Sequence, residues 1–452
     1  MSVQQMKSPK KIESPEGEFW KSAMDDEYES LISKNTWTLT KPPKGAKIIK
    51  TKWVFTKKEE PSGTRYKARL VAKGFTQRPG IDYLETFAPV MRKSSVRLLL
   101  AFACQNDLVV HHVDVKTAYL NADLAEEVYI DQPIGYEAKT RERLVCRLNK
   151  AIYGLKQSAK CWNEKLNEIM AQIGLKPFAS EECIFANKNN ELIVGAYVDD
   201  LLIVSASIEM IANFKKRLSD QLQITDKGEL QEFLGISIRK TKDTMTLSQE
   251  KLIDDLLGQH DLLNCNGVKT PISTTVDLNE SEESSATEVC VFQSIIGSLM
   301  YIASSTRPGI QYATSKLAQY MSAPTQMHLN AAKRVLKYLK ETKSVGLTYK
   351  NNHADNPVIH ADADFANGED SRSISGVAVF FGGNLIEWNS TKQQLVALAT
   401  CESEINSIKD AACDAIYFRE LLNEINAPGH QQPVTIYNDN LLGQDILERG
   451  GK

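Results

Sequence analysis

Apolar residues recur along the chain at two different spacings, which predicts short strands mixed with amphipathic helices. Two runs rich in β-forming residues, "KIIKTKWVFTKK" (47–58) and "RYKARLVAKGF" (65–75), flank the turn signal Pro61-Ser62-Gly63. We therefore expect a pair of strands there. A segment with helical spacing, 94–106, and a strand, 108–115, follow.

Two further helices are predicted in the middle of the chain, because their apolar residues fall on one face. The apolar positions are Trp162, Leu166, Ile169, Met170 and Ile173 in the first, and Met210, Ile211, Phe214, Leu218 and Leu222 in the second. The acidic, serine-rich segment 275–289 is expected to be the main linker. After it we predict helices at 297–321 and 328–342, strands at 357–365 and 375–390, a helix at about 402–426 and a strand at 433–439.

One apolar run contains two adjacent acids, Asp199 and Asp200, within "ELIVGAYVDDLLIVSAS" (191–207). Both flanks are typical of strands, so the acids are expected at the tip of a β-hairpin. A simple turn is one interpretation, because Asp is a good turn residue. No Gly or Asn stands beside the acids, however, and two adjacent carboxylates repel each other. A divalent cation such as Mg²⁺ would offset that repulsion.

A third acid is expected on a neighbouring strand. Asp114 ends the β-type run in "VVHHVDVKTAYLN". Three carboxylates on adjacent strands can hold two Mg²⁺ ions roughly 3.5–4 Å apart, which is the arrangement for in-line phosphoryl transfer. The pattern therefore predicts a metal-dependent nucleotidyl transfer site.

Length and charge narrow the class of protein. The chain has 452 residues, so we expect two or three domains. Its formal net charge is only −3, but residues 41–80 contain twelve Lys or Arg against two Glu, which favours a phosphate-binding face over an ordinary solvated surface. The polar N-terminus is no signal peptide and no apolar run reaches membrane-spanning length, so we expect no membrane partner.

Together these motifs resemble the reverse transcriptase and ribonuclease H region of copia-type LTR retrotransposon Pol polyproteins. The blocks that carry the resemblance, in the family's order, are "NTWTLTKPPKGAKIIKTKWVF", "RYKARLVAKGFTQRPGIDYLETFAPV", "DVKTAYLNADLAEEVYIDQPIGY", "LNKAIYGLKQSAKCW", "YVDD", "GELQEFLGISI" and "GSLMYIASSTRP". The resemblance extends from about Trp20 to the end of the chain. It implies a right-hand polymerase of the α+β class, with fingers, palm and thumb, followed by a ribonuclease H-like α/β domain.

The resemblance assigns roles to residues of the polymerase region. Asp114, Asp199 and Asp200 would be the catalytic metal ligands. Tyr119 would exclude ribonucleotides by a clash with the sugar 2′ position, although a core tyrosine is the alternative. The remaining assignments are Lys67, Arg69 and Lys73 to the incoming triphosphate, Gln157 to the nascent base pair, and Leu234 and Gly235 to the primer grip, where a packed β-turn is the alternative.

In the last hundred residues, Asp362, Glu404 and Asp439 resemble the metal ligands of ribonuclease H. Glu404 fits the family's spacing better than Glu402 does, while each acid alone is typical of a solvated helix cap or strand end. The chain stops at Lys452, before a further helix and a fourth ligand. We therefore expect a truncated domain that cleaves the RNA of a hybrid weakly or not at all.

The sequence thus predicts an RNA-directed DNA polymerase of a copia-type retrotransposon, dependent on Mg²⁺ with Mn²⁺ as a substitute. The predicted parts are a disordered leader (1–18), the reverse transcriptase (19–274), a linker with connection helices (275–350) and the truncated ribonuclease H-like domain (351–452). Its partners would be an RNA template, a DNA primer, dNTPs and the RNA–DNA hybrid, in a cytoplasmic particle or the nucleus. The rivals are a decayed or domesticated remnant that at most binds nucleic acid, and a nuclease without polymerase activity.

Overall fold

The computed structural model describes residues 13–60, 63–273, 278, 285–351, 357–366 and 370–449. Most of the predicted leader and linker lies outside these residues. In the described residues, a helix begins before the predicted end of the leader and another before the predicted end of the linker. Helix α2 (Gly17–Ser33) begins inside the predicted leader. Helix α7 (Ala286–Ser305) takes up the last four residues of the predicted linker, because Ser285 and Glu288 form a capping box at its start.

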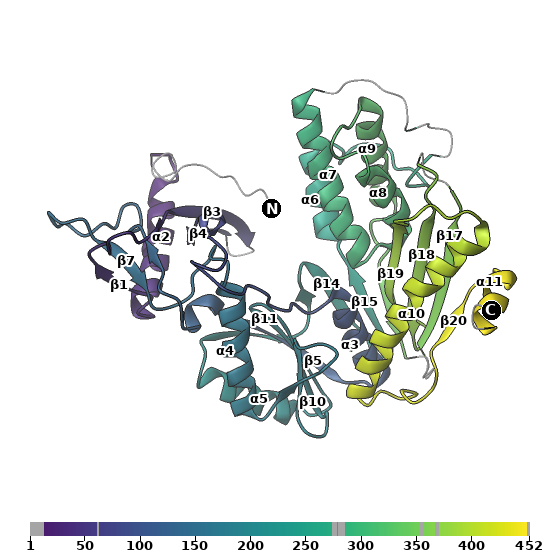
Figure 1. The fold of residues 1–452 in the computed structure, drawn as a ribbon, viewed down its shortest axis with the longest axis horizontal. Coiled ribbons are helices and arrows are strands. Elements are labelled where there is room, and N and C mark those ends of the chain that lie inside the picture. The colour runs from purple at the N-terminus through teal and green to yellow at the C-terminus, as the bar shows by residue number, and fades with distance from the viewer. Residues whose placement is uncertain are drawn as a thin grey trace.

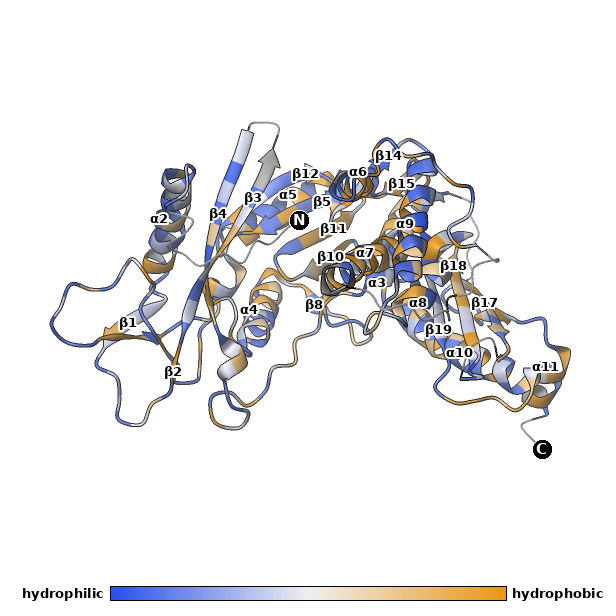
Figure 2. Cartoon of the chain, turned by 90° about the horizontal axis from the view of Figure 1, so that it is seen from above, coloured by the Kyte–Doolittle hydropathy of each residue, from blue (hydrophilic) through white to orange (hydrophobic). Residues whose placement is uncertain are grey.

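The N-terminal region is built on the hairpin of β3 (Thr51–Glu60) and β4 (Gly63–Ala72). Helix α2 packs against this hairpin, and Trp20 and Phe55 lie in their shared core. A small sheet of β1 (Trp37–Thr40), β7 (Val145–Leu148), β6 (Tyr129–Ile130) and β2 (Ile48–Ile49) completes the region, which lies at the left of Figure 1. In the hydropathy colours of Figure 2, β4 is banded with the blue of its charged residues.

The central region is a six-stranded sheet in the order β12-β5-β11-β10-β9-β8. Residues alternate between its two faces, as the period of a strand requires. Leu201 and Ile203 face a core shared with α4 and α5, while Leu202 and Val204 face a core shared with α3. The elements are α3 (Lys93–Gln105), β5 (Val109–Val115), α4 (Ser158–Ile173), β8 (Lys176–Pro177), β9 (Ile184–Ala186), β10 (Leu192–Tyr197), β11 (Asp200–Ser205), α5 (Ile208–Ser219) and β12 (Ile224–Glu229).

A second sheet follows, in the order β13 (Glu232–Phe233), β14 (Ile236–Lys240), β15 (Thr244–Ser248) and β16 (Leu347–Lys350). Strand β16 returns from about a hundred residues further along the chain to pair with β15. Between them, four helices share one core: α6 (Glu250–Gln259), α7, α8 (Gln311–Ala318) and α9 (Gln326–Glu341). The predicted division at residue 274 therefore cuts through one packed helical cluster.

One helix in this cluster, α7, contradicts the expectation that no apolar run reaches membrane-spanning length. The segment Glu288–Ser305 of α7 is long and apolar enough to cross a membrane by length and composition. Its apolar side chains Phe292, Ile296 and Leu299 are fully buried against the other helices of the cluster. Because a core helix passes the same test, this is weak evidence for a span.

The C-terminal region is a sheet in the order β19-β18-β17-β20, with α10 across one face. Strands β17 (Pro357–Asp364), β18 (Ile374–Phe381) and β19 (Asn384–Lys392) are antiparallel, and β20 (Thr435–Tyr437) runs parallel to β17. Helix α10 spans Thr400–Glu424, close to the predicted 402–426. A short helix, α11 (Leu441–Glu448), follows β20.

Helix α3 lies between the central sheet and the C-terminal sheet (Figure 1). Every residue from Ser94 to Cys104 is buried, so the helix has no solvent face. It contacts β5 and β11 of the central sheet on one side and β19 of the C-terminal sheet on another. Arg97, 2% exposed, donates to the carbonyls of Ile386 (2.6 Å) and Ser304 (2.7 Å) and pairs with Glu387 (3.0 Å). The central region, the helical cluster and the C-terminal sheet therefore meet at α3.

Candidate active site

The hairpin of β10 and β11 places the two adjacent acids at the edge of the central sheet. Tyr197 pairs with Asp200, so Val198 and Asp199 form the two-residue tip. Val198 has φ of 57°, although a tight hairpin turn with this geometry favours Gly or Asn. The indole Nε1 of Trp162 donates to the Val198 carbonyl (2.8 Å) and holds the strained turn in place.

Pairing of β11 with β5 brings the third acid to the hairpin. Asp200 lies directly opposite Asp114, and the backbone N–H of Val115 donates to the carbonyl of Asp199 (2.8 Å). All three acids line one cavity of about 760 Å³. Three carboxylates are a hard-oxygen donor set that suits Mg²⁺, so these residues fit the predicted ion.

Lys227, a residue that sequence reasoning missed, also reaches this cavity. Its Nζ lies 3.5 Å from Asp200 Oδ1 and 3.9 Å from Asp114 Oδ1. Strand β12 carries Lys227 and pairs with β5, which explains its position. The pairing of strands separated by more than a hundred residues is not visible in the sequence pattern.

The two adjacent acids have opposite pKa shifts. Burial and the neighbouring charges of Asp200 and Asp114 raise the pKa of Asp199. Burial would also raise the pKa of Asp200, but a hydrogen bond from His112 and the charge of Lys227 outweigh it and lower the pKa. The His112 Nε2 to Asp200 Oδ1 distance is 2.6 Å. The site therefore holds two carboxylates of different proton affinity side by side.

Strand β4 presents a row of basic residues to the same cavity. Arg65, Lys67 and Arg69 alternate along the strand, and all three line the cavity. Lys73 follows the end of the strand and, among the described residues, is not part of the cavity lining. The structure thus places Arg65 where sequence reasoning placed Lys73. The period of two in "RYKAR" was the signal that could have found it.

The structure also separates Gln157 from the cavity. Its side chain is 1% exposed, accepts a hydrogen bond from Gln77 (3.0 Å) and donates to the carbonyl of Asp82 (3.4 Å). The amide thus serves to tie down the loop at 77–82, and in the described part of the chain the cavity lining includes Tyr153 and not Gln157. The predicted contact of Gln157 with the base pair is therefore not supported by its position.

Tyr119 lies close to the acids, in the short helix η2 (Ala118–Asn121) that follows β5. Burial and the charge of Asp199 raise its pKa. Its ring packs against the ring of Tyr153, with centroids 4.9 Å apart and planes at 73°. Tyr119 is thus partly in the core and partly beside the acids, and its predicted contact with the sugar stays a prediction.

Leu234 and Gly235 line the cavity from the turn between β13 and β14. Both have positive φ, 50° and 71°. The hydroxyl of Tyr301, on α7, donates to the carbonyl of Leu234. The helical cluster therefore fixes the turn that was predicted to grip the primer.

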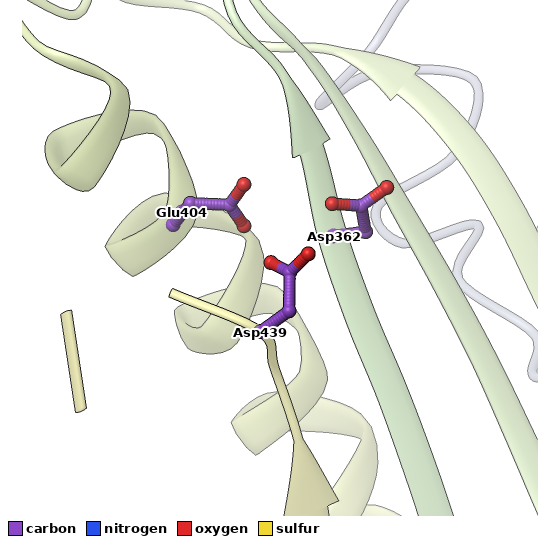
Figure 3. A group of neighbouring side chains, drawn as sticks. All are labelled: Asp362, Glu404 and Asp439. Atoms are coloured by element: carbon purple, nitrogen blue, oxygen red, sulfur yellow. The ribbon is translucent and has the colours of Figure 1, made fainter. Parts of the chain in front are cut away.

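A second group of acids forms in the C-terminal sheet. Ligand atoms of Asp362, Glu404 and Asp439 all lie within 4.8 Å of one another, from β17, α10 and the segment that follows β20 (Figure 3). Asn438 donates to Glu404 (2.8 Å), while burial and the two neighbouring acids raise the pKa of Glu404. Glu402 instead accepts a hydrogen bond from the backbone of Leu398 (2.7 Å). These three oxygen donors fit a divalent cation such as Mg²⁺ or Mn²⁺.

The cavity combines three acids with a basic strand, which is a combination typical of the polymerase class, and the comparisons with known proteins agree on that class. Residues 34–274 match the family "Reverse transcriptase (RNA-dependent DNA polymerase)", so the chain belongs to this family. The predicted copia-type character is confirmed by the relatives. The chain is 36% identical over 95% of its length to "Retrovirus-related Pol polyprotein from transposon RE1" of Arabidopsis thaliana. It is also 36% identical over 96% of its length to the polyprotein from transposon TNT 1-94 of Nicotiana tabacum.

The chain spans 30% and 34% of the length of these two relatives. Among solved structures, the foamy viral protease-reverse transcriptase in complex with an RNA/DNA hybrid matches 96% of this chain and 50% of its own, with a TM-score of 0.51 and 12% identity. This similarity shows the fold alone. It confirms the predicted α+β polymerase architecture.

Proposed function

We propose that the protein is an RNA-directed DNA polymerase that extends a DNA primer on an RNA template with dNTPs. The observation that carries the proposal is one cavity that joins Asp114, Asp199 and Asp200 to the basic row Arg65, Lys67 and Arg69. Carboxylates hold divalent cations and a basic row binds a triphosphate, and nucleotide addition requires both. The family match supports the reaction.

Each group has a defined task in this reaction. The acids would hold two Mg²⁺ ions, which supply charge neutralisation and activation of the primer hydroxyl. The basic face of β4 binds the phosphates and orients the nucleotide. Lys227 adds a positive charge beside Asp200, where the phosphates react. The turn at Leu234, fixed by Tyr301, positions the primer end.

Primer extension by the purified protein on an RNA template with Mg²⁺ tests the proposal. Asp199→Asn should abolish extension, because it removes a metal-binding charge at almost constant volume. The control is Asp123→Asn, since Asp123 is 76% exposed and pairs only with Lys150 among the described residues. An Asp199→Asn protein that extends primers like the parent would refute the metal assignment. A parent that binds nucleic acid without extending primers would favour the decayed remnant.

We also propose that Asp362, Glu404 and Asp439 form a second metal site that cleaves the RNA strand of a hybrid. The gathering of their oxygens within 4.8 Å favours this second function. Incubation of a hybrid labelled in its RNA strand with Mg²⁺ or Mn²⁺ tests it. Asp362→Asn should remove cleavage and spare extension, and Asp199→Asn should do the reverse. The preference for Mg²⁺ and a location in a cytoplasmic particle or the nucleus stay predictions.

A further inference from the structure

Tyr153 lines the catalytic cavity from the loop between β7 and α4, a position that the sequence motifs did not single out. Its backbone is fixed to the end of the basic strand, because the N–H of Ala72 donates to the carbonyl of Tyr153 (2.8 Å). The next residue, Gly154, has φ of 91°, and a Cβ there would lie 2.2 Å from the carbonyl oxygen of Ala72. The loop is thus pressed directly onto β4.

The ring of Tyr153 contacts two side chains with different expected tasks. The guanidinium carbon of Arg69 lies over the ring, 5.0 Å from its centroid. The ring of Tyr119 meets it edge to face, with centroids 4.9 Å apart. Arg69 comes from β4 and Tyr119 from η2, so this one ring joins the phosphate-binding side of the cavity to the side of the acids. Burial raises the pKa of Tyr153 to about 12, so the ring is neutral at physiological pH.

We infer that Tyr153 is a positioning residue that sets both the triphosphate contact of Arg69 and the sugar selectivity of Tyr119. The inference rests on the proposed polymerase function. A guanidinium held over an aromatic face by a cation–π contact has fewer accessible orientations, which limits where its N–H groups can meet phosphate. The edge-to-face contact restricts rotation of Tyr119, so that its ring cannot retreat from the nucleotide sugar. Removal of the Tyr153 ring therefore loosens both contacts together.

Single-nucleotide incorporation of dNTP and of the matching rNTP tests the inference in Tyr153→Phe and Tyr153→Leu. The Phe variant keeps the ring and should behave like the parent. The Leu variant should raise the KM for dNTP and lower the dNTP-to-rNTP ratio of kcat/KM, each by about three- to tenfold. The kcat for dNTP should change less, because the acids are untouched. In a Tyr119→Val background, Tyr153→Leu should lower the ratio no further, since its effect passes through Tyr119.

Tyr136→Leu is a matched control, because Tyr136 also carries a cation (Lys21, 4.2 Å) and an aromatic partner (Tyr28, 4.3 Å) but lies in the N-terminal core. It should lower stability without changing the ratio. If Tyr153→Leu does not fold, Tyr153→Met provides a longer, flexible side chain without a ring that can adapt to the space the ring leaves.

An unchanged ratio in a folded Leu or Met variant, or an additive effect with Tyr119→Val, would overturn the inference while leaving the polymerase function intact. A parent that fails to extend primers would instead refute the proposed function. In that case, calorimetric titration with dNTP and rNTP in the presence of Ca²⁺ compares the same variants without turnover. A parent preference for dNTP that persists in Tyr153→Leu would then overturn the inference.

Discussion

Asp199 and Asp200 are neighbours in the chain, yet their environments act on them in opposite directions. The pKa of Asp199 is raised, so its ionised form is less favourable in the folded protein than in the unfolded chain. The pKa of Asp200 is lowered, so its ionised form is favoured by folding. The pair therefore contributes to stability with opposite signs, and the sign depends on pH.

Without metal, Asp199→Asn should increase the free energy of unfolding at pH 7, and Asp200→Asn should decrease it. The contribution of Asp199 is favourable below its unfolded pKa of about 4 and is lost as pH rises through its raised folded pKa. That of Asp200 is present above about pH 4 and is lost as pH falls through its lowered folded pKa. Denaturant unfolding in EDTA at pH 7 and pH 4 measures both. Equal effects of the two substitutions at pH 7 would contradict the assignment.

At the residue scale, sequence motifs singled out Asp114, Asp199 and Asp200 and led us to expect Asp114 on a strand next to the hairpin. The pairing of β5 with β11 brings the three acids to one cavity, as that expectation requires. Lys227 and Tyr153 were missed, since only strand pairing and loop packing bring them to that cavity. The resemblance assigned Gln157 to the nascent base pair, whereas its amide forms hydrogen bonds with Gln77 and Asp82.

At the scale of elements, the alternation of residues along strand β4 places its basic side chains on one face, toward the cavity. Template binding should therefore depend on salt mainly through the face that carries Lys67 and Arg69. Changing both to Gln should flatten the plot of log affinity against log salt by roughly one unit for each phosphate that is no longer neutralised. Lys73→Gln is the control and should leave the slope unchanged. If Lys73→Gln flattened the slope as much as the change of Lys67 and Arg69 does, facing the cavity from β4 would not be what decides which residues bind phosphate.

The close contact between β4 and the loop that carries Tyr153 requires a glycine. A second glycine with a similar φ but open surroundings provides a comparison. Gly154 (φ 91°) faces backbone atoms of β4, whereas Gly174 (φ 89°), at the end of α4, has open space around the position of a Cβ. Gly174→Ala should lower the free energy of unfolding by about 1 kcal/mol, the cost of the backbone conformation alone. Gly154→Ala should cost more and should also raise the KM for dNTP. Unfolding curves and incorporation kinetics check both, and equal costs would show that the loop can move away from β4.

The elements themselves were largely predictable, because hairpins and amphipathic helices have local periods. The hairpin of β10 and β11, helices α4 and α5 and the helix α10 all lie where the spacing placed them. The pairing of β16 with β15 and the packing of α6 with α9 were not predictable, since each joins segments far apart in sequence. This is why the boundary drawn at residue 274 divides a single core.

For the whole molecule, Arg97 is the charged residue at the centre of the junction. It is 2% exposed, and the ring of Trp388 lies 4.1 Å from its guanidinium carbon. Arg97→Met should lower the free energy of unfolding by about 3 kcal/mol, because it leaves Glu387 and two buried carbonyls without their donor. Arg372→Met is the control, since its pair with Asp370 is exposed and should contribute less than about 1 kcal/mol. Denaturant unfolding of both variants measures the difference, and a small effect of Arg97→Met would show that the three regions are held by apolar packing alone.

The burial of α3 on every side has a consequence for how such a chain can be recombined. A chimera joined near residue 350 would combine the C-terminal sheet of one parent with the α3 of another, although Ile386 and Trp388 pack in the same core as that helix. A chimera that preserves this core must therefore take Lys93–Gln105 and the C-terminal sheet from the same parent. For the same reason, a substitution in α3 changes the packing of the central sheet and of the C-terminal sheet at once, and neither sheet can adapt there independently of the other.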